Sequence, residues 1–172
     1  KNDEGTWLFS ATNTYTGSTT INGGKLLLGP VASLASGSAV LVNYGATLAG
    51  SGRANGSVSV AAGGLLAPGD VNSVGTLNLG GALGLTNAVL CFDLASPDAA
   101  GVVTDKVTVV GAATVSGTNT VVLSFPNGSA PEGSYTLMTF ASRTGTGTFA
   151  LAAPYPNATL TTNATSLMLT VV

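Results

Sequence analysis

Carboxylates are the side chains of this sequence with the clearest capacity for chemistry. Five acidic residues follow residue 60: Asp70, Asp93, Asp98, Asp105 and Glu132. Glycoside hydrolysis normally needs two carboxyl groups at a fixed separation, and Asp93, Asp98 and Asp105 fall within the length of one repeat of the chain. Asp98, however, lies in the loop-like segment SPDAAG, and Asp105 stands where a loop meets a strand. Solvated or turn-capping carboxylates are therefore the favoured interpretation, and catalysis is the alternative.

Nucleophilic and metal chemistry lack their usual residues. The 172-residue chain has no histidine and one cysteine, Cys91, which excludes a Ser-His-Asp triad, an imidazole metal site and an internal disulfide. No cation close in sequence would activate Cys91, so we expect a small buried hydrophobic residue. Asp70 and Asn72 form at most an opportunistic calcium site, since the Gly-Gly-x-Gly-x-Asp calcium repeat is absent. We expect no catalytic residue, metal or cofactor.

Aromatic side chains are the remaining candidates, as a platform for sugars. The residues expected to be exposed are Trp7, Tyr15, Tyr44, Tyr135 and Tyr155. Trp7 and Tyr15 are expected to pack over the first turn of the fold as a lid, whereas Tyr44 should point outward. Single scattered aromatic residues do not make a binding site.

The composition indicates a folded chain with an unusually neutral surface. Charged residues make up 7% of the sequence, apolar residues 45%, and the net charge is −2. High apolar content argues against disorder, and the lack of a basic face argues against nucleic acid as a partner. We expect no transmembrane segment, because no run approaches the 18 or so apolar residues of a spanning helix. No signal peptide is visible at Lys1, so we expect that any targeting segment was removed or lies outside this sequence.

A repeat built on glycine and leucine is the main organising feature of the sequence. Segments beginning at Ile21, Val42 and Val60 share the pattern apolar-x-x-Gly-x-x-Leu and start about 20 residues apart. A fourth match begins at Leu77, and a degenerate fifth runs Leu85, Ala88, Cys91, which places Cys91 in a leucine position. The pattern predicts an interior ladder of Ile21, Leu27, Val42, Leu48, Val60, Leu66, Leu77 and Leu83, with corner glycines Gly24, Gly45, Gly63 and Gly80.

This period predicts a β-solenoid in which each repeat forms one coil. Apolar residues two apart, such as Val40 with Val42 and Val107 with Val109, share one face of a strand. Glycines allow the tight corners, and stacked coils pair their strands about 4.8 Å apart. An antiparallel sandwich with short strands is the main alternative. An eight-stranded outer-membrane barrel is disfavoured, because such barrels carry two aromatic girdles that are absent here.

The segment GTWLFSATNTYTGSTTINGGKLLLG (5–29) closely resembles the autotransporter-associated β-strand repeat. Gly5, Asn13, Thr14, Tyr15, Thr16, Gly17, Thr19, Gly24 and Leu26 fall on the usual pattern, and Ala11 replaces a usual glycine. A looser resemblance continues to residue 117, although the corner that follows Ala-Pro-Gly at 67–69 is longer than usual. The resemblance implies a parallel β-helix exported to the bacterial surface, as in autotransporter passengers, and no catalytic activity.

The last part of the chain departs from the repeat. PNGSAPEG (126–133) is rich in turn residues, and strands are expected at 135–141, 147–151, 159–162 and 167–172. Their close spacing predicts an antiparallel meander. We therefore predict an all-β fold: a right-handed parallel β-helix over 1–125, with 126–172 as a C-terminal antiparallel β cap or modified last coils that protect the open coil.

The sequence favours a non-catalytic extracellular structural protein over an enzyme. The hypothesis is a β-solenoid surface stalk or a self-assembling fibre subunit, secreted or displayed outside the bacterial outer membrane. Self-association, head-to-tail or through edge strands, is the expected partnership. An adhesin or glycan-binding passenger module, with surface glycans as partners, is the alternative function.

Overall fold

The computed structural model describes residues 1–70, 73–95, 104–126, 128, 132–155 and 157–172. These residues form twenty short strands and no helix, arranged in three sheets. Sheet A contains β1 (Thr6–Phe9), β3 (Lys25–Leu28), β6 (Thr47–Gly50), β9 (Leu65–Pro68), β12 (Val89–Asp93), β15 (Thr118–Ser124) and β18 (Thr148–Leu151). Sheet B contains β4 (Ser33–Leu34), β7 (Arg53–Ala54), β10 (Thr76–Leu79), β13 (Lys106–Val109), β16 (Gly133–Thr139), β20 (Ser166–Val171) and β19 (Ala158–Thr162). Sheet C contains β2 (Thr19–Ile21), β5 (Val40–Val42), β8 (Val58–Val60), β11 (Leu83–Thr86), β14 (Ala113–Ser116) and β17 (Arg143–Thr144).

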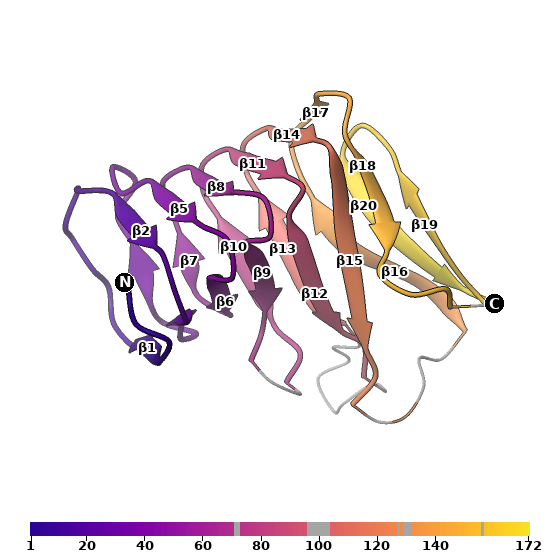
Figure 1. Cartoon of the computed structure of the whole chain (residues 1–172), viewed down its shortest axis with the longest axis horizontal. Helices are drawn as coiled ribbons and strands as arrows, with labels where there is room; N and C mark the ends of the chain where they lie inside the picture. Colours follow the sequence, from indigo (N-terminus) through magenta and orange to yellow (C-terminus); the bar gives the residue numbers. More distant parts are fainter. Residues whose placement is uncertain (71–72, 96–103, 127, 129–131, 156) are drawn as a thin grey trace.

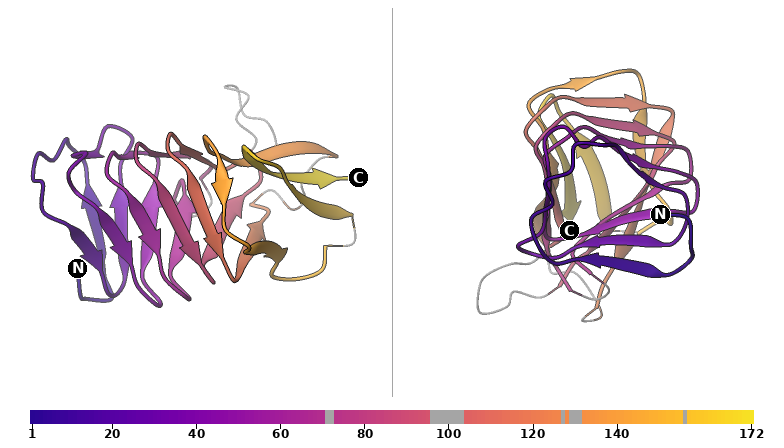
Figure 2. Two further views of the ribbon diagram at one scale, coloured as in Figure 1. Left: turned by 90° about the horizontal axis from the view of Figure 1, so that it is seen from above. Right: turned by 90° about the vertical axis from the view of Figure 1, so that its left-hand side faces the viewer.

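The chain visits the three sheets in turn and winds into a parallel β-helix. Each coil contributes one strand to each sheet, and successive coils stack along the long axis (Figure 1). Viewed along that axis, the coils enclose a three-sided column (Figure 2). The predicted fold class, an all-β parallel β-helix with antiparallel strands at its C-terminal end, is therefore confirmed.

Side chains at equivalent positions of successive coils stack on one another, and we call each such stack a file. One file in sheet C shows how the sequence repeat forms the core. In sheet C, Ile21 pairs with Val42, Val42 with Val60, and Val60 with Leu85. All four point into the column and are at most 2% exposed. Alternate residues of each strand face inward because the side-chain period of a strand is two, so the column interior is a stack of Leu, Val, Ile and Ala side chains.

The leucine ladder runs through Leu26, Leu48, Leu66 and Leu90, which are stacked in sheet A and buried. The prediction was therefore wrong at Leu27, which pairs with Ala49 and is half-buried on the outer face. The corner between β2 and β3 has three residues, 22–24, whereas the next has four, 43–46. Counting a fixed number of residues from Ile21 therefore overshoots by one. The same shift places Leu90, and not Cys91, in the ladder.

Leu77, Gly80 and Leu83 are a second correction to the predicted ladder and its corners. Leu77 pairs with Val107 in sheet B, and Leu83 pairs with Val58 in sheet C, so both are buried in other files. Gly80 lies between sheets B and C, whereas Gly24, Gly45 and Gly63, with φ of 60–71°, lie between sheets C and A. The longer corner after β9 displaces the repeat, so the fourth match to the pattern is out of phase.

The C-terminal part of the fold also differs from the expected meander. β16, β17 and β18 continue the three sheets as a further parallel coil. Among the strands that the structure describes, antiparallel pairing is confined to β20 with β16 and to β20 with β19, which lies at the edge of sheet B. The predicted strands at 135–141 and 147–151 were therefore assigned the wrong pairing. β15 and β16, the strands before and after the turn-rich residues, lie in sheets A and B, so the column continues beyond these residues.

Candidate functional site at the loop edge

Insertions between coils gather along one edge of the column. Segments 69–75, 94–105 and 125–132 each join a strand of sheet A to the next strand of sheet B, and we call them the loop edge. The equivalent corner after β6 needs only residues 51–52. Figure 1 shows that the strands before these connections, β9, β12 and β15, all end on the same side of the molecule. In repeat folds such insertions often form the binding face, so the loop edge is the candidate location of a site.

A hollow of about 220 Å³ lies on the outer face of sheet A beside the loop edge. Ala49, Ala67 and Cys91, from three successive coils, form its floor. Polar residues line the remainder of this hollow: Lys25, Asp70, Asp93, Asp105 and Ser124. We call this hollow the trough. It exists because the outward residues at the floor are small, whereas larger side chains stand on both sides.

Asp105 is the most unusual residue of the trough because it is a carboxylate with 2% of its surface exposed. Its Oδ1 accepts a hydrogen bond from the backbone N–H of Gly75 at 2.7 Å, and its Oδ2 accepts one from the N–H of Asp93 at 2.9 Å. Burial raises the pKa of Asp105 to about 7, although these two hydrogen bonds oppose the shift. Asp105 thus joins two segments of the loop edge that are far apart in sequence.

Cys91 is half-buried at the floor of the trough, so the expectation of a buried core cysteine was wrong. Burial raises the pKa of its thiol, and the charges of Asp93 and Asp105 raise it further. A thiol that is held protonated is a poor nucleophile, because the thiolate is the reactive form.

Lys25 is the trough's cation, and its Nζ lies 3.3 Å from Oδ1 of Asp70. The Asp70 side chain is 52% exposed, so this pair contributes at most about 1 kcal/mol to stability. Asn72, which forms the opportunistic calcium site with Asp70, lies outside the described residues, as does Asp98. Among the described residues no group of three His, Cys, Asp or Glu side chains is arranged to hold a metal ion.

The trough brings together three of the five carboxylates singled out from the sequence, Asp70, Asp93 and Asp105. Glu132 is exposed within the loop edge. A general acid needs a carboxyl oxygen free to reach the substrate, but both oxygens of Asp105 accept backbone hydrogen bonds. Sequence reasoning missed Lys25 and Ser124. The lengthening of successive corners was the signal that would have drawn attention to this edge.

The aromatic residues do not converge on the trough. Tyr44 is 82% exposed, as expected, and its ring lies over Gly63. Tyr135 was expected to be exposed but is buried in the core. Tyr155 is half-buried and donates a hydrogen bond from its hydroxyl to the backbone oxygen of Leu123.

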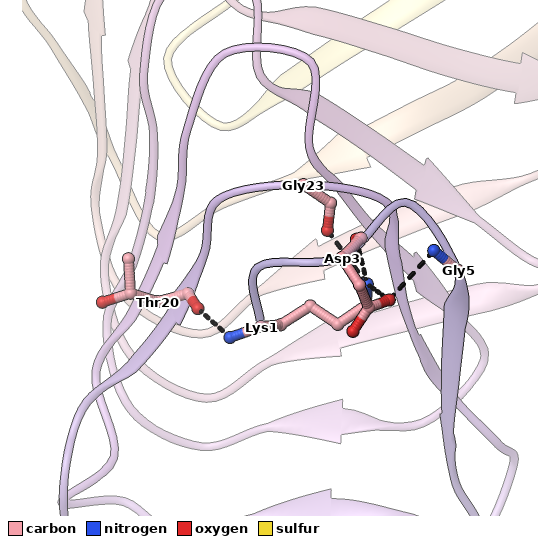
Figure 3. Close-up of polar contacts among 5 residues, drawn as sticks. All are labelled: Lys1, Asp3, Gly5, Thr20 and Gly23. Atoms are coloured by element: carbon pink, nitrogen blue, oxygen red, sulfur yellow. Dashed lines mark hydrogen bonds and ion pairs between the residues drawn. The ribbon is translucent and has the colours of Figure 1, made fainter.

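Trp7 and Tyr15 lie at the other end of the column, beside a second hollow of about 270 Å³. Trp7 pairs with Leu26, so it belongs to an inward-facing file, yet it is 49% exposed. Lys1 lies beside it: its Nζ is 5.7 Å from the centre of the Trp7 ring. Figure 3 shows the Lys1 side chain held by Asp3 and Gly23, while its backbone nitrogen donates to the oxygen of Thr20.

The strand order and the in-register core define this chain as a parallel β-helix. Residues 1–28 match the model of one family, described as the Passenger-associated-transport-repeat. Residues 1–28 therefore form an autotransporter-associated repeat, as the sequence resemblance indicated, and this repeat suggests a passenger-like region. Such a repeat is typical of secreted or surface proteins. No curated protein matches the chain. None of the described residues forms a helix long and apolar enough to span a membrane.

Proposed function

We propose that this chain is a non-catalytic structural segment of an exported bacterial protein, a β-solenoid stalk that holds other parts of the molecule away from the outer membrane. The observation that carries this proposal is the continuous stacking of coils in all three sheets, from β1 to β18 in sheet A. Backbone ladders of this kind run the length of a rod and resist bending. The passenger-type repeat at 1–28 supports the export route.

The chemistry of the trough supports a structural role over catalysis. Asp105 uses both oxygens to hold the loop edge, and the Cys91 thiol is held protonated. The alternative is that the chain degrades polysaccharides. It predicts that the parent chain has hydrolase or lyase activity on a panel of polysaccharides and that the double variant Asp93→Asn/Asp105→Asn loses this activity. Activity of the parent chain on any of them, absent from this double variant, would overturn the non-catalytic proposal.

Accessibility on intact cells tests the surface location. Bacteria that express the gene are treated with a protease that cannot cross the outer membrane, and this chain is followed with an antibody. We expect loss of the antibody signal while a periplasmic marker protein remains intact. Protection of the chain on intact cells, with digestion only after lysis, would contradict a surface stalk.

The exposed aromatic rings of Tyr44 and Trp7, which lie away from the loop edge, favour one second candidate, an adhesin or glycan-binding passenger module. Exposed Tyr44 and half-exposed Trp7 are the residues most suited to stack on a sugar. A glycan array probed with the parent chain, Tyr44→Ala and Trp7→Ala tests this function. Binding that one of the two substitutions abolishes would support it, and an array without signal would remove it.

A further inference from the structure

The parallel column ends in two short strands whose outer edges pair with no other strand of the described residues. β17 is the last strand of sheet C, and β18 is the last strand of sheet A. Sheet B ends differently, in the antiparallel strands β20 and β19. The unpaired N–H and C=O groups of an edge strand are a template for further strand addition. The end formed by β17 and β18 is therefore the place where a second copy of this chain would stack.

Arg143, the first residue of β17, faces into the column at this end. It pairs with Ala113, which is fully buried, and belongs to the inward file Val40, Val58, Leu83, Ala113, Arg143. Its neighbour Thr144 faces outward, where its hydroxyl lies 3.1 Å from that of Thr114. The small side chain of Ala113 leaves room above it for the stem of Arg143.

The guanidinium of Arg143 lies at the corner between sheets C and A, where residues 145–147 join β17 to β18. It donates a hydrogen bond to the backbone oxygen of Gly147 and lies 5.9 Å from the centre of the Phe149 ring. Phe149 belongs to β18 and packs against the core. The Nε of Arg143 is buried and has no acceptor among the described residues. The last inward position of this file is therefore occupied by a cation over an aromatic ring.

We propose that Arg143 is an end stop that prevents a second copy from stacking on the C-terminal end of the column. A docked coil would cover the guanidinium with an apolar interior and remove its remaining access to water. The charge of arginine is permanent, and burying it without a carboxylate partner is unfavourable. Inward-pointing charges are a recognised protection of exposed strand edges. This inference concerns contacts between copies and is independent of the proposed role as a stalk.

Lys1 and Trp7 provide a comparison within the same molecule. The Lys1 side chain is 1% exposed and lies over the Trp7 ring, which faces the column interior from sheet A. A cation thus also lies over an inward aromatic ring of β1, the first strand of sheet A. Arg143 therefore occupies an inward strand position at one end of the column, and Lys1 lies over an inward-facing ring at the other end.

Sedimentation velocity over a concentration series tests the end stop. The purified parent chain is compared with Arg143→Leu, which removes the charge, and with Arg143→Lys, which keeps it. Arg53→Leu is the matched control, because Arg53 lies exposed on the outer face of sheet B. We expect the parent, Arg143→Lys and Arg53→Leu to remain monomeric. Arg143→Leu should dimerise with a dissociation constant at least about tenfold lower than that of the parent, which corresponds to 1.4 kcal/mol of association free energy.

Two outcomes would overturn the proposal. One is an Arg143→Leu variant that has the circular dichroism spectrum of the parent and stays monomeric throughout the series. The other is a parent chain that self-associates as strongly as Arg143→Leu. If Arg143→Leu does not fold, Arg143→Gln takes its place, since its amide retains a donor for Gly147 without the charge. A monomeric, folded Arg143→Gln would then count against the end stop in the same way.

Discussion

At the scale of single residues, Asp105 is unusual because it is a carboxylate in the interior. Most of the chain's surface is neutral, yet one carboxylate is buried where two insertions meet and accepts hydrogen bonds from Gly75 and Asp93. Burial disfavours the charged form of Asp105 more than those two bonds favour it, so its pKa rises from 3.8 to about 7. Ionisation of Asp105 therefore changes the stability of the folded state near neutral pH.

The free energy of unfolding should fall as the pH rises from about 4 to about 7 and then level off. In this window the folded chain keeps the Asp105 proton that the unfolded chain has released, because the folded pKa is the higher one. The slope approaches about 1.4 kcal/mol per pH unit for one proton. Urea denaturation at a series of pH values measures it.

Asp105→Asn should flatten this pH profile, even though its amide group cannot accept both backbone hydrogen bonds and the variant is less stable overall. Glu4→Gln, which changes an exposed carboxylate, is the control and should leave the profile unchanged. The same slope in Asp105→Asn as in the parent would show that another group carries the pH dependence.

At the scale of the strands, the alternation between inward and outward positions decides which residues matter. Leu66 is fully buried in the ladder with Leu48 and Leu90. Leu27 is half-buried on the outside of the same sheet. The two leucines look alike in the sequence repeat, but only Leu66 fills the column.

Leu66→Ala should reduce the free energy of unfolding by about 2–5 kcal/mol, because it removes buried surface and leaves a cavity between two coils. Leu27→Ala should cost less than about 1.5 kcal/mol, since its side chain is already partly in water. Chemical denaturation of both variants measures the difference. Equal losses would mean that the register of sheet A is not the one described.

The sequence predicted the strands well where one rule operated without interruption. Val40, Val42, Val58 and Val60 are buried in register, as their alternation indicated. The prediction failed where a corner changed length by one residue, because a one-residue shift moves a side chain to the opposite face. Leu27 and Cys91 were misplaced for this reason.

The candidate site was only partly accessible to sequence reasoning. Asp93 and Asp105 were singled out as neighbours, and the structure brings them together with Asp70. The contact of Asp105 with Gly75 spans 30 residues, whereas Arg143 contacts Gly147 and Phe149, which follow it by four and six residues. No local pattern encodes the contact of Asp105 with Gly75, because it arises from the stacking of whole coils. The register that turns Arg143 inward beside Ala113 arises in the same way.

For the whole molecule, we expect the free energy of unfolding to depend little on salt concentration. The described residues contain two ion pairs, Lys1–Asp3 and Lys25–Asp70, each with a half-exposed carboxylate. Raising sodium chloride from 0.1 to 1 M should therefore change the free energy of unfolding by less than about 1 kcal/mol. Urea denaturation at the two salt concentrations measures the change. A loss of several kcal/mol would indicate that ionic contacts, and not the apolar column, stabilise the fold.

Because the coils contain different numbers of residues, the length of the rod is not proportional to the number of residues in the chain. Adjacent coils are bridged by side-chain hydrogen bonds between residues 19 positions apart at Thr19 and Ser38, but 31 positions apart at Asn119 and Ala88. Each coil nevertheless advances the column by the same strand spacing, about 4.8 Å. Residues added at a corner therefore lengthen a coil without adding to the length of the rod, because the strand spacing stays the same. Residues can therefore be inserted at the loop edge during evolution with no change in the length of the rod, whereas a longer rod requires complete new coils.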